Sequence, residues 1–149
     1  MIDPREAQLL QPYLAVADAE RALEFYVDVF EMSETYRLPM PDGRIGHAEL
    51  RKGSIRLLLS DPFPEGGVQA PDPAAAHASS LLLYVEDLEA TLKRAMTRGS
   101  RLEREPKDEF FGDRTAAIID PFGHRWFIHQ RLETLAPEEI MARFNQQSG

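Results

Sequence analysis

The sequence predicts an α+β fold of two tandem βαβββ modules. These would form a concave mixed sheet with helices on its outer face, followed by a C-terminal helix. The chain of 149 residues has a length typical of one domain. Its halves repeat at an offset of 69, which takes Asp18 to Asp87 and Leu23 to Leu92. Each half has the order strand, helix and three strands, and two such sheets packed side by side would leave a ligand-sized cleft.

The first module is expected at about residues 8–60 of a single domain, 1–149. Residues 10–17 are typical of a strand, which Pro12 limits to an edge or early position. Asp18 suits the N-cap of a helix over 19–31, where apolar residues recur at helical spacing. Three strands are then expected at 35–38, 44–50 and 54–60, with tight turns at 42–43 and 51–53.

The second module is expected at about residues 79–131, after a linker at 61–78 that is rich in proline and glycine. A strand over 79–86 leads to a helix that Asp87 caps and Gly99 ends. Later elements are strands at 100–104, 114–119 and 125–130 and a C-terminal helix at about 137–146.

The repeat also predicts which strand residues correspond. At the offset of 69, Leu50 matches Ile119. One residue inserted in the following turn then matches Leu57 to Phe127.

Composition narrows the classes of function. The chain has 25 acidic and 17 basic residues, a net charge of −8, which disfavours binding to nucleic acid. Cysteine is absent, so disulfides, thiolate nucleophiles and cysteine-ligated metals are excluded. No apolar run is long enough to span a bilayer, so no membrane partner is expected. These features predict a cytoplasmic protein that binds a small molecule or a protein.

Several motifs point to a known family. They lie at residues 12–16, 22–26, 112–114 and 120–126, and read PYLAV, ALEFY, GDR and DPFGHRW. Together they resemble the vicinal oxygen chelate superfamily of glyoxalase I, bleomycin-resistance proteins, fosfomycin-resistance enzymes and extradiol dioxygenases. With HAEL at 47–50 and PEE at 137–139, the chain looks most similar to the PhnB-like branch. The resemblance implies the same two-module fold and a homodimer.

The resemblance also implies where a metal site would lie. Metal enzymes of this family hold a divalent ion with histidine or glutamate at four strand positions. Carried over, these positions are Gln11, Leu57 or Leu59, Ser80 and Phe127. None supplies an imidazole or carboxylate, so the resemblance implies no metal and no cofactor. The alternative is a non-standard site for Zn, Ni, Mn or Fe at His47, Glu49 and His129.

Strand alternation selects the polar candidates for the ligand site. His47 and Glu49 share a strand face. Three roles are open for this pair: a base with the residue that orients it, half of a metal site, or a salt-bridged structural pair. His129 shares its face with Phe127 and is expected in the cleft. Arg114 would clamp an anionic ligand group or pair with Asp113 or Glu49.

Aromatic side chains supply the remaining candidates. Phe110 and Phe111 lie on a loop, as a lid or a dimer contact. Trp126 has the opposite parity to Phe127 and is expected under the helix, while His77 in the linker is expected in solvent. The complete set of predicted ligand-binding residues is Gln11, Tyr13, His47, Glu49, Phe110, Phe111, Arg114, Phe127 and His129.

Three functions are compatible with these features. The preferred one is a metal-independent small-molecule binder of the bleomycin-resistance type, with an antibiotic as one candidate ligand and a cation suiting the net charge. The alternative is a metal-dependent lyase, isomerase or dioxygenase, in which the ion acts as a Lewis acid. The third is an interaction module whose cleft is filled by side chains.

Overall fold

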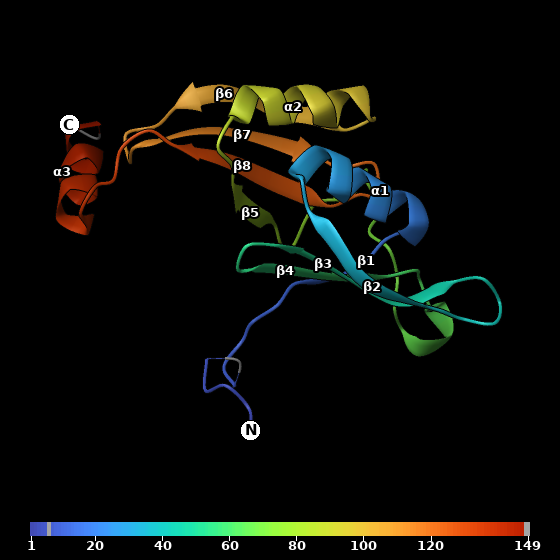
Figure 1. The fold of residues 1–149 in the computed structure, drawn as a ribbon. Helices are drawn as coiled ribbons and strands as arrows, with labels where there is room; N and C mark the ends of the chain where they lie inside the picture. The colour runs from blue at the N-terminus through green and yellow to red at the C-terminus, as the bar shows by residue number, and fades with distance from the viewer. Residues whose placement is uncertain (6, 148–149) are drawn as a thin grey trace. The chain divides into compact units, whose positions relative to one another are not determined.

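The computed structural model describes residues 1–5 and 7–147. The chain divides into two compact units, Met1–Pro71 and Asp72–Gly149. Each unit contains one four-stranded mixed sheet and a helix packed on it (Figure 1). The order strand, helix, three strands occurs twice and is followed by a further helix. The predicted α+β class with tandem βαβββ modules and a C-terminal helix is therefore confirmed.

Unit 1 has the sheet order β1-β4-β3-β2, in which only β1 and β4 run parallel. Its elements are β1 (Tyr13–Ala15), α1 (Ala19–Phe30), β2 (Ser33–Pro39), β3 (Ile45–Lys52), β4 (Ile55–Ser60) and the short 3₁₀ helix η1 (Pro64–Gly66).

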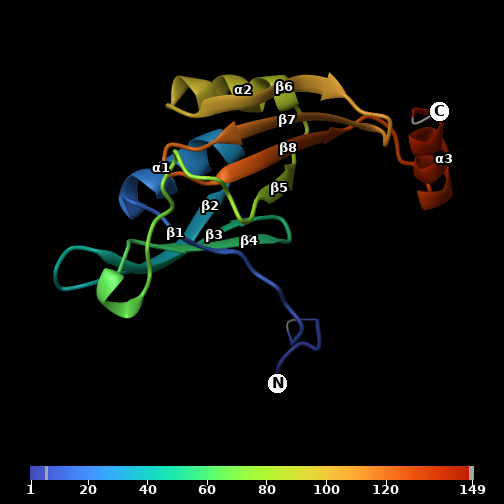
Figure 2. The same ribbon diagram turned by 180° about the vertical axis from the view of Figure 1, so that it is seen from behind.

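Unit 2 has the corresponding order β5-β8-β7-β6, with β5 and β8 parallel. Its elements are β5 (Leu81–Tyr84), α2 (Leu88–Thr97), β6 (Arg101–Asp108), β7 (Asp113–Ile119), β8 (Arg125–Arg131) and α3 (Pro137–Gln147). The strand predicted at 100–104 continues to Asp108 through Pro106, because β6 is an edge strand and needs no donor there. Figures 1 and 2 show α2 along the sheet and α3 beyond the end of β8.

The core of unit 1 forms where α1 covers its sheet. Leu23, Tyr26 and Phe30 recur at helical spacing and are fully buried. They share this core with Leu50 and Leu59 from the central strands. The other face of the same strands carries Tyr13, Tyr36, His47 and Glu49. In each unit, we call the face of the sheet that the unit's own helix α1 or α2 does not cover the helix-free face.

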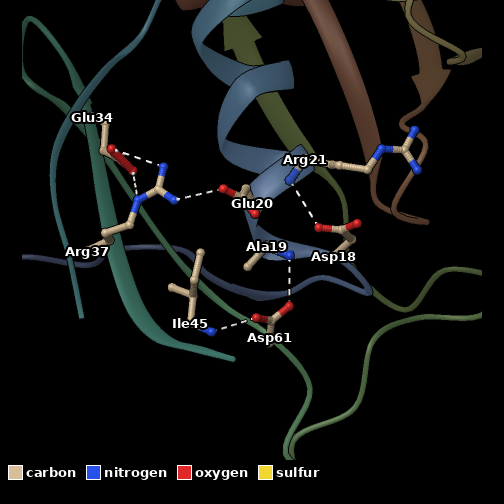
Figure 3. Close-up of polar contacts among 8 residues, drawn as sticks. All are labelled: Asp18, Ala19, Glu20, Arg21, Glu34, Arg37, Ile45 and Asp61. Atoms are coloured by element: carbon tan, nitrogen blue, oxygen red, sulfur yellow. Dashed lines mark hydrogen bonds and ion pairs between the residues drawn. The ribbon is translucent and has the colours of Figure 1, made fainter. Parts of the chain in front are cut away.

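Two aspartates fix the start of α1, as Figure 3 shows. Asp18 is the N-cap, and its Oδ1 accepts a hydrogen bond from the Arg21 amide at 3.1 Å. Asp61 follows β4, and its carboxylate accepts from the amides of Ala19 at 2.8 Å and Ile45 at 2.6 Å. One side chain thus ties the helix N-terminus to the start of β3.

Replacing Asp61 by alanine is expected to lower the free energy of unfolding by about 2 kcal/mol, because two amides lose their acceptor at a half-buried position. Urea denaturation would measure this. The matched variant is Asp42→Ala. The Asp42 carboxylate accepts hydrogen bonds from the backbone amide and the guanidinium of Arg44 on the surface. This exposed ion pair should contribute clearly less to stability than the contacts of Asp61 do. Equal costs for the two variants would contradict the role assigned to Asp61.

The strand registers correct two of the predicted correspondences. Tyr13 pairs with Leu58, and Leu82 pairs with Phe127, so Leu58 rather than Leu57 corresponds to Phe127. Leu50 lies on the face covered by α1 and corresponds to Ile118, not Ile119. The cause is turn length, because residues 53–54 connect β3 to β4 whereas residues 120–124 connect β7 to β8. A hairpin turn sets strand register, and a shift of one residue exchanges the two faces.

Candidate functional site

On the helix-free face of unit 1, His47 lies between two tyrosines. The hydroxyl of Tyr13 is 2.8 Å from Nδ1, and the hydroxyl of Tyr36 is 3.0 Å from Nε2. A neutral imidazole has one donor and one acceptor, so one hydroxyl donates to the ring and the other accepts from it. Burial and the neighbouring Tyr36 raise the pKa of Tyr13, which keeps its hydroxyl protonated at neutral pH. Both ring nitrogens of His47 are therefore engaged.

Glu49 lies on the same face as His47, as predicted, but no hydrogen bond or ion pair joins these two described side chains. Its carboxylate is buried and lies 3.2 Å from Nε of Arg51 and 3.4 Å from Nε of Arg56. The alternative of a salt-bridged pair of His47 with Glu49 is therefore wrong. The reason is that Arg51, two residues along β3, and Arg56, on the neighbouring strand β4, contact the carboxylate instead.

On the helix-free face of unit 2, a buried carboxylate organises a second cluster. Oδ2 of Asp113 accepts from the Tyr84 hydroxyl at 2.6 Å and lies 2.9 Å from Nδ1 of His129. Oδ1 lies 3.1 Å from Nε of Arg131. Burial favours the neutral acid, but the hydrogen bonds from Tyr84 and His129 and the charge of Arg131 outweigh it and lower the pKa of Asp113.

The ionised state of Asp113 decides the tautomer of His129. A carboxylate can only accept, so Nδ1 must carry the hydrogen and donate it. In the neutral imidazole the lone pair is then on Nε2. The same hydrogen bond to Asp113, together with burial, raises the pKa of Tyr84. The cluster therefore has an ordered set of donors and acceptors at neutral pH.

Aromatic rings surround His129. Phe111 stacks on the imidazole with ring centroids 6.0 Å apart and an interplanar angle of 24°. Tyr84 meets it edge-on at 5.5 Å, and the guanidinium of Arg131 lies 4.6 Å from the centre of the Tyr84 ring. We call Tyr84, Phe111, Asp113, His129 and Arg131 the His129 cluster.

Gly112 positions the loop that carries Phe111. Its φ of +95° is in the left-handed region, and a Cβ there would lie 2.7 Å from the carbonyl oxygen of Glu133. The Gly112 carbonyl accepts from the amides of Leu132 and Glu133, which holds the loop to the end of β8. A glycine is thus required where the chain passes from Phe111 to Asp113.

Phe110 and Phe127 lie near the His129 cluster but have other neighbours. Phe110 contacts Phe111, and also Phe144 of α3 at 5.7 Å between ring centroids. Phe127 is half-buried on the helix-free face, with the guanidinium groups of Arg104 and Arg125 5.3 and 5.2 Å from its ring centre. Trp126 is buried on the opposite face, as its strand parity predicts, and its Nε1 donates a hydrogen bond to Asp120 at 2.8 Å.

Arg114 and His77 have partners that the sequence did not predict. Arg114 lies on the α2 side of β7, 2.7 Å from Glu89 and 2.8 Å from Asp108. The alternative of a pairing with Asp113 is wrong, because adjacent strand residues point to opposite faces. The expectation of a solvated His77 is also wrong, since its Nε2 donates to the Gly123 carbonyl at 2.6 Å and the residue is half-buried.

The donor atoms do not fit a divalent metal ion. With the register corrected, the family positions fall at Gln11, Leu58, Ser80 and Phe127, which offer neither imidazole nor carboxylate. Within residues 1–5 and 7–147, no three histidine, aspartate or glutamate side chains are grouped to hold a metal. Of the alternative ligands, His47 has both nitrogens engaged and Glu49 is paired with two arginines.

The predicted ligand-binding set lacks six residues that surround His47, Glu49 and His129: Tyr36, Arg51, Arg56, Tyr84, Asp113 and Arg131. Each lies on the same face as a predicted residue, through cross-strand pairing, as with Tyr36 opposite Glu49 and Tyr84 opposite His129, or through strand alternation, as with Arg51 after Glu49. A correct register would have found them, because directly paired residues share a face. None of the described helices is both long and apolar enough to cross a membrane.

Comparisons with known proteins agree with this architecture. A family model described as Glyoxalase/Bleomycin resistance protein/Dioxygenase superfamily matches residues 8–128. An uncharacterised protein of Mycobacterium bovis is 34% identical over 141 residues, which cover 93% of each chain.

Two solved structures show the shared fold. A protein from Pseudomonas aeruginosa has a TM-score of 0.68 at 21% identity, over 85% of this chain and 99% of that chain. A mutant glyoxalase I from Zea mays has a TM-score of 0.65 at 21% identity, over 85% of this chain and 46% of that chain. At this identity the likeness concerns the fold and not the activity.

Proposed function

Because the chain belongs to the glyoxalase/bleomycin resistance protein/dioxygenase superfamily, we propose that it binds a small organic molecule without a metal ion, as bleomycin-resistance-type proteins do. The observation that carries this proposal is the His129 cluster on the helix-free face of the β5–β8 sheet. It combines half-exposed aromatic rings with polar groups that already have their partners. Such a surface binds a flat ligand at little cost of reorganisation.

The charge that faces solvent argues against the cationic ligand suggested by the net charge. The side chain of Asp113 is 3% exposed and already contacts Tyr84, His129 and Arg131. The side chain of Arg131, in contrast, is 50% exposed. In unit 1, Glu49 is 8% exposed and Arg51 is 46% exposed. Both helix-free faces therefore present guanidinium groups, while their carboxylates are covered. Local charge governs contact with a ligand more than net charge does, because salt screens distant charges.

Replacing Phe111 by alanine is expected to weaken ligand binding about tenfold, because the ring that stacks on His129 supplies roughly 1.5 kcal/mol of contact. Saturation-transfer NMR with a panel of anionic, neutral and cationic aromatic compounds would find a ligand and measure its affinity. The matched variant is Phe144→Ala on α3, which removes a phenylalanine that contacts Phe110 rather than His129. It should bind as the unsubstituted protein does.

The same samples separate binding from chemistry. Mass spectrometry should recover the bound compound unchanged, and elemental analysis should find no stoichiometric divalent metal. A melting temperature that falls on EDTA treatment, together with turnover restored by Zn, Ni, Mn or Fe, would establish the metal-dependent alternative instead.

A second candidate is metal-free proton transfer at His129. It is favoured by the hydrogen bond from Nδ1 to buried Asp113, which orients the ring and leaves the lone pair on Nε2. Conversion of a bound compound that is lost in His129→Gln, with binding retained, would support this function. Recovery of every ligand unchanged would contradict it.

We also propose that the protein is a cytoplasmic homodimer of the PhnB-like type. The absence of cysteine suits a reducing compartment. Light scattering coupled to size-exclusion chromatography would test the dimer, and a mass of 16.9 kDa at micromolar concentration would contradict it.

A further inference from the structure

A pocket of about 200 Å³ opens in unit 1 beside the turn between β3 and β4. Its lining residues all belong to unit 1 and include no member of the His129 cluster of unit 2, so its test is independent of the proposed function. Its lining combines apolar side chains from the segment before β1 with basic and polar groups from the hairpin. The lining residues are Leu9, Leu10, Gln11, Arg51, Gly53, Ser54, Ile55 and Arg56.

The two arginines of this pocket form an unbalanced pair of charges. Arg51 and Arg56 are directly opposite in the β3–β4 register, an arrangement in which like charges repel. Glu49 is the carboxylate between them, and it contacts the Nε atom of each arginine. One buried negative charge thus holds two positive charges in place and leaves one uncompensated.

The outer edges of the two guanidinium groups remain available. Glu49 contacts the Nε atom of each arginine. The terminal amino groups of Arg51 and Arg56 have no hydrogen-bond partner in the part of the chain that the structure describes. They are not enclosed either, since the side chains are 46% and 25% exposed. The end of a guanidinium fork presents two parallel N–H donors, which match the two oxygens of a carboxylate or phosphate.

We propose that this pocket binds the carboxylate or phosphate group of a small amphiphilic molecule. The anion lies across the outer edges of Arg51 and Arg56, where it neutralises the charge that Glu49 leaves over. The exposed apolar side chains of Leu9, Leu10 and Ile55 provide a wall for a short hydrocarbon body. Gln11, predicted from the sequence as a ligand-binding residue, borders this pocket.

The experiment titrates the full-length protein with hexanoate, hexyl phosphate, hexanamide and inorganic phosphate. Two-dimensional ¹H–¹⁵N NMR follows the amides of Gly53 and Ser54 and the Nε–H groups of Arg51 and Arg56. Hexanoate or hexyl phosphate should shift these signals in a saturable way, whereas hexanamide should not. Inorganic phosphate should bind more weakly than hexyl phosphate, because it makes no contact with the apolar wall.

Variants test whether the two guanidinium groups hold the anion. Arg51→Gln and Arg56→Gln should each weaken binding about tenfold or more, as expected for a charge-assisted hydrogen bond. The charge-matched control is Arg37→Gln, whose side chain pairs with Glu34 and Glu20 on the α1 side of the same sheet. It should change affinity by less than about twofold, because surface charges at that distance are screened.

Three results would overturn the proposal. No saturable shift at millimolar hexanoate or hexyl phosphate would show that the pocket binds no such anion. Equal weakening by Arg37→Gln would reduce the effect to general electrostatics. Binding of hexanamide as tight as that of hexanoate would assign the pocket to apolar contact alone. A melting curve for each variant confirms that the protein is folded.

Discussion

Replacing Asp113 by alanine is expected to lower the free energy of unfolding by about 3–5 kcal/mol, since it removes one partner from a buried ionic network. The carboxylate is 3% exposed. It accepts hydrogen bonds from Tyr84 and His129 and forms an ion pair with Arg131. Without it, the buried imidazole loses the acceptor for Nδ1, and the tyrosine hydroxyl and guanidinium lose their anchor. Urea denaturation at pH 7 would measure the loss, and ligand binding at the His129 cluster should disappear with it.

Asp108→Ala is the matched control for this result. Asp108 also pairs with an arginine, Arg114, but its side chain is 60% exposed on the edge strand β6. Its loss should cost less than about 1 kcal/mol, the usual range for a surface ion pair. If Asp113→Ala cost no more than Asp108→Ala, the network would contribute nothing beyond a surface contact.

The contribution of Asp113 should also depend on pH. Its pKa is held below the ordinary value of 3.8, so the native state binds the proton less readily than the unfolded chain does. Such a group stabilises the fold fully above its unfolded pKa and loses that effect as pH falls through its native pKa. The stability difference between the unsubstituted protein and Asp113→Asn should therefore be constant near neutral pH and shrink below about pH 4. A difference that grew on acidification would contradict the lowered pKa.

The second large effect is expected for Leu59→Ala, which should cost about 3 kcal/mol because it leaves a cavity under α1. Leu59 is fully buried, and its register partner Ala48 is buried with it. The neighbouring variant Leu58→Ala removes the same atoms from the helix-free face, where the side chain is half-buried. Its cost should be near 1 kcal/mol, the loss of partial burial without an enclosed cavity.

This pair of variants tests the strand register directly. Unfolding by urea with an unchanged m-value would give the two free energies on the same scale. If Leu58→Ala cost as much as Leu59→Ala or more, the assignment of the two faces of β4 would be wrong. The match of Leu58 with Phe127 would then be wrong as well.

Features decided within a few residues of the chain could be predicted from the sequence. Asp18 and Asp87 cap α1 and α2 as expected, because an N-cap needs only its own side chain and the amides of the next turn. Trp126 and Phe127 lie on opposite faces of β8, because the alternation of a strand is local. The repeated order of elements, and with it the α+β class, also follows from local patterns of caps, turns and hydrophobic periodicity.

Partners and registers that join distant segments were decided only by the tertiary structure. The match of Leu58 with Phe127 depends on two turns of different length, and one residue of error moves a side chain to the other face. His77 bonds to Gly123, 46 positions away, and no local pattern predicts that contact. The sequence by itself therefore determined the elements, their order and the faces of single strands. The tertiary structure determined which faces meet and which charges pair, because these depend on contacts between segments that the chain brings together only on folding.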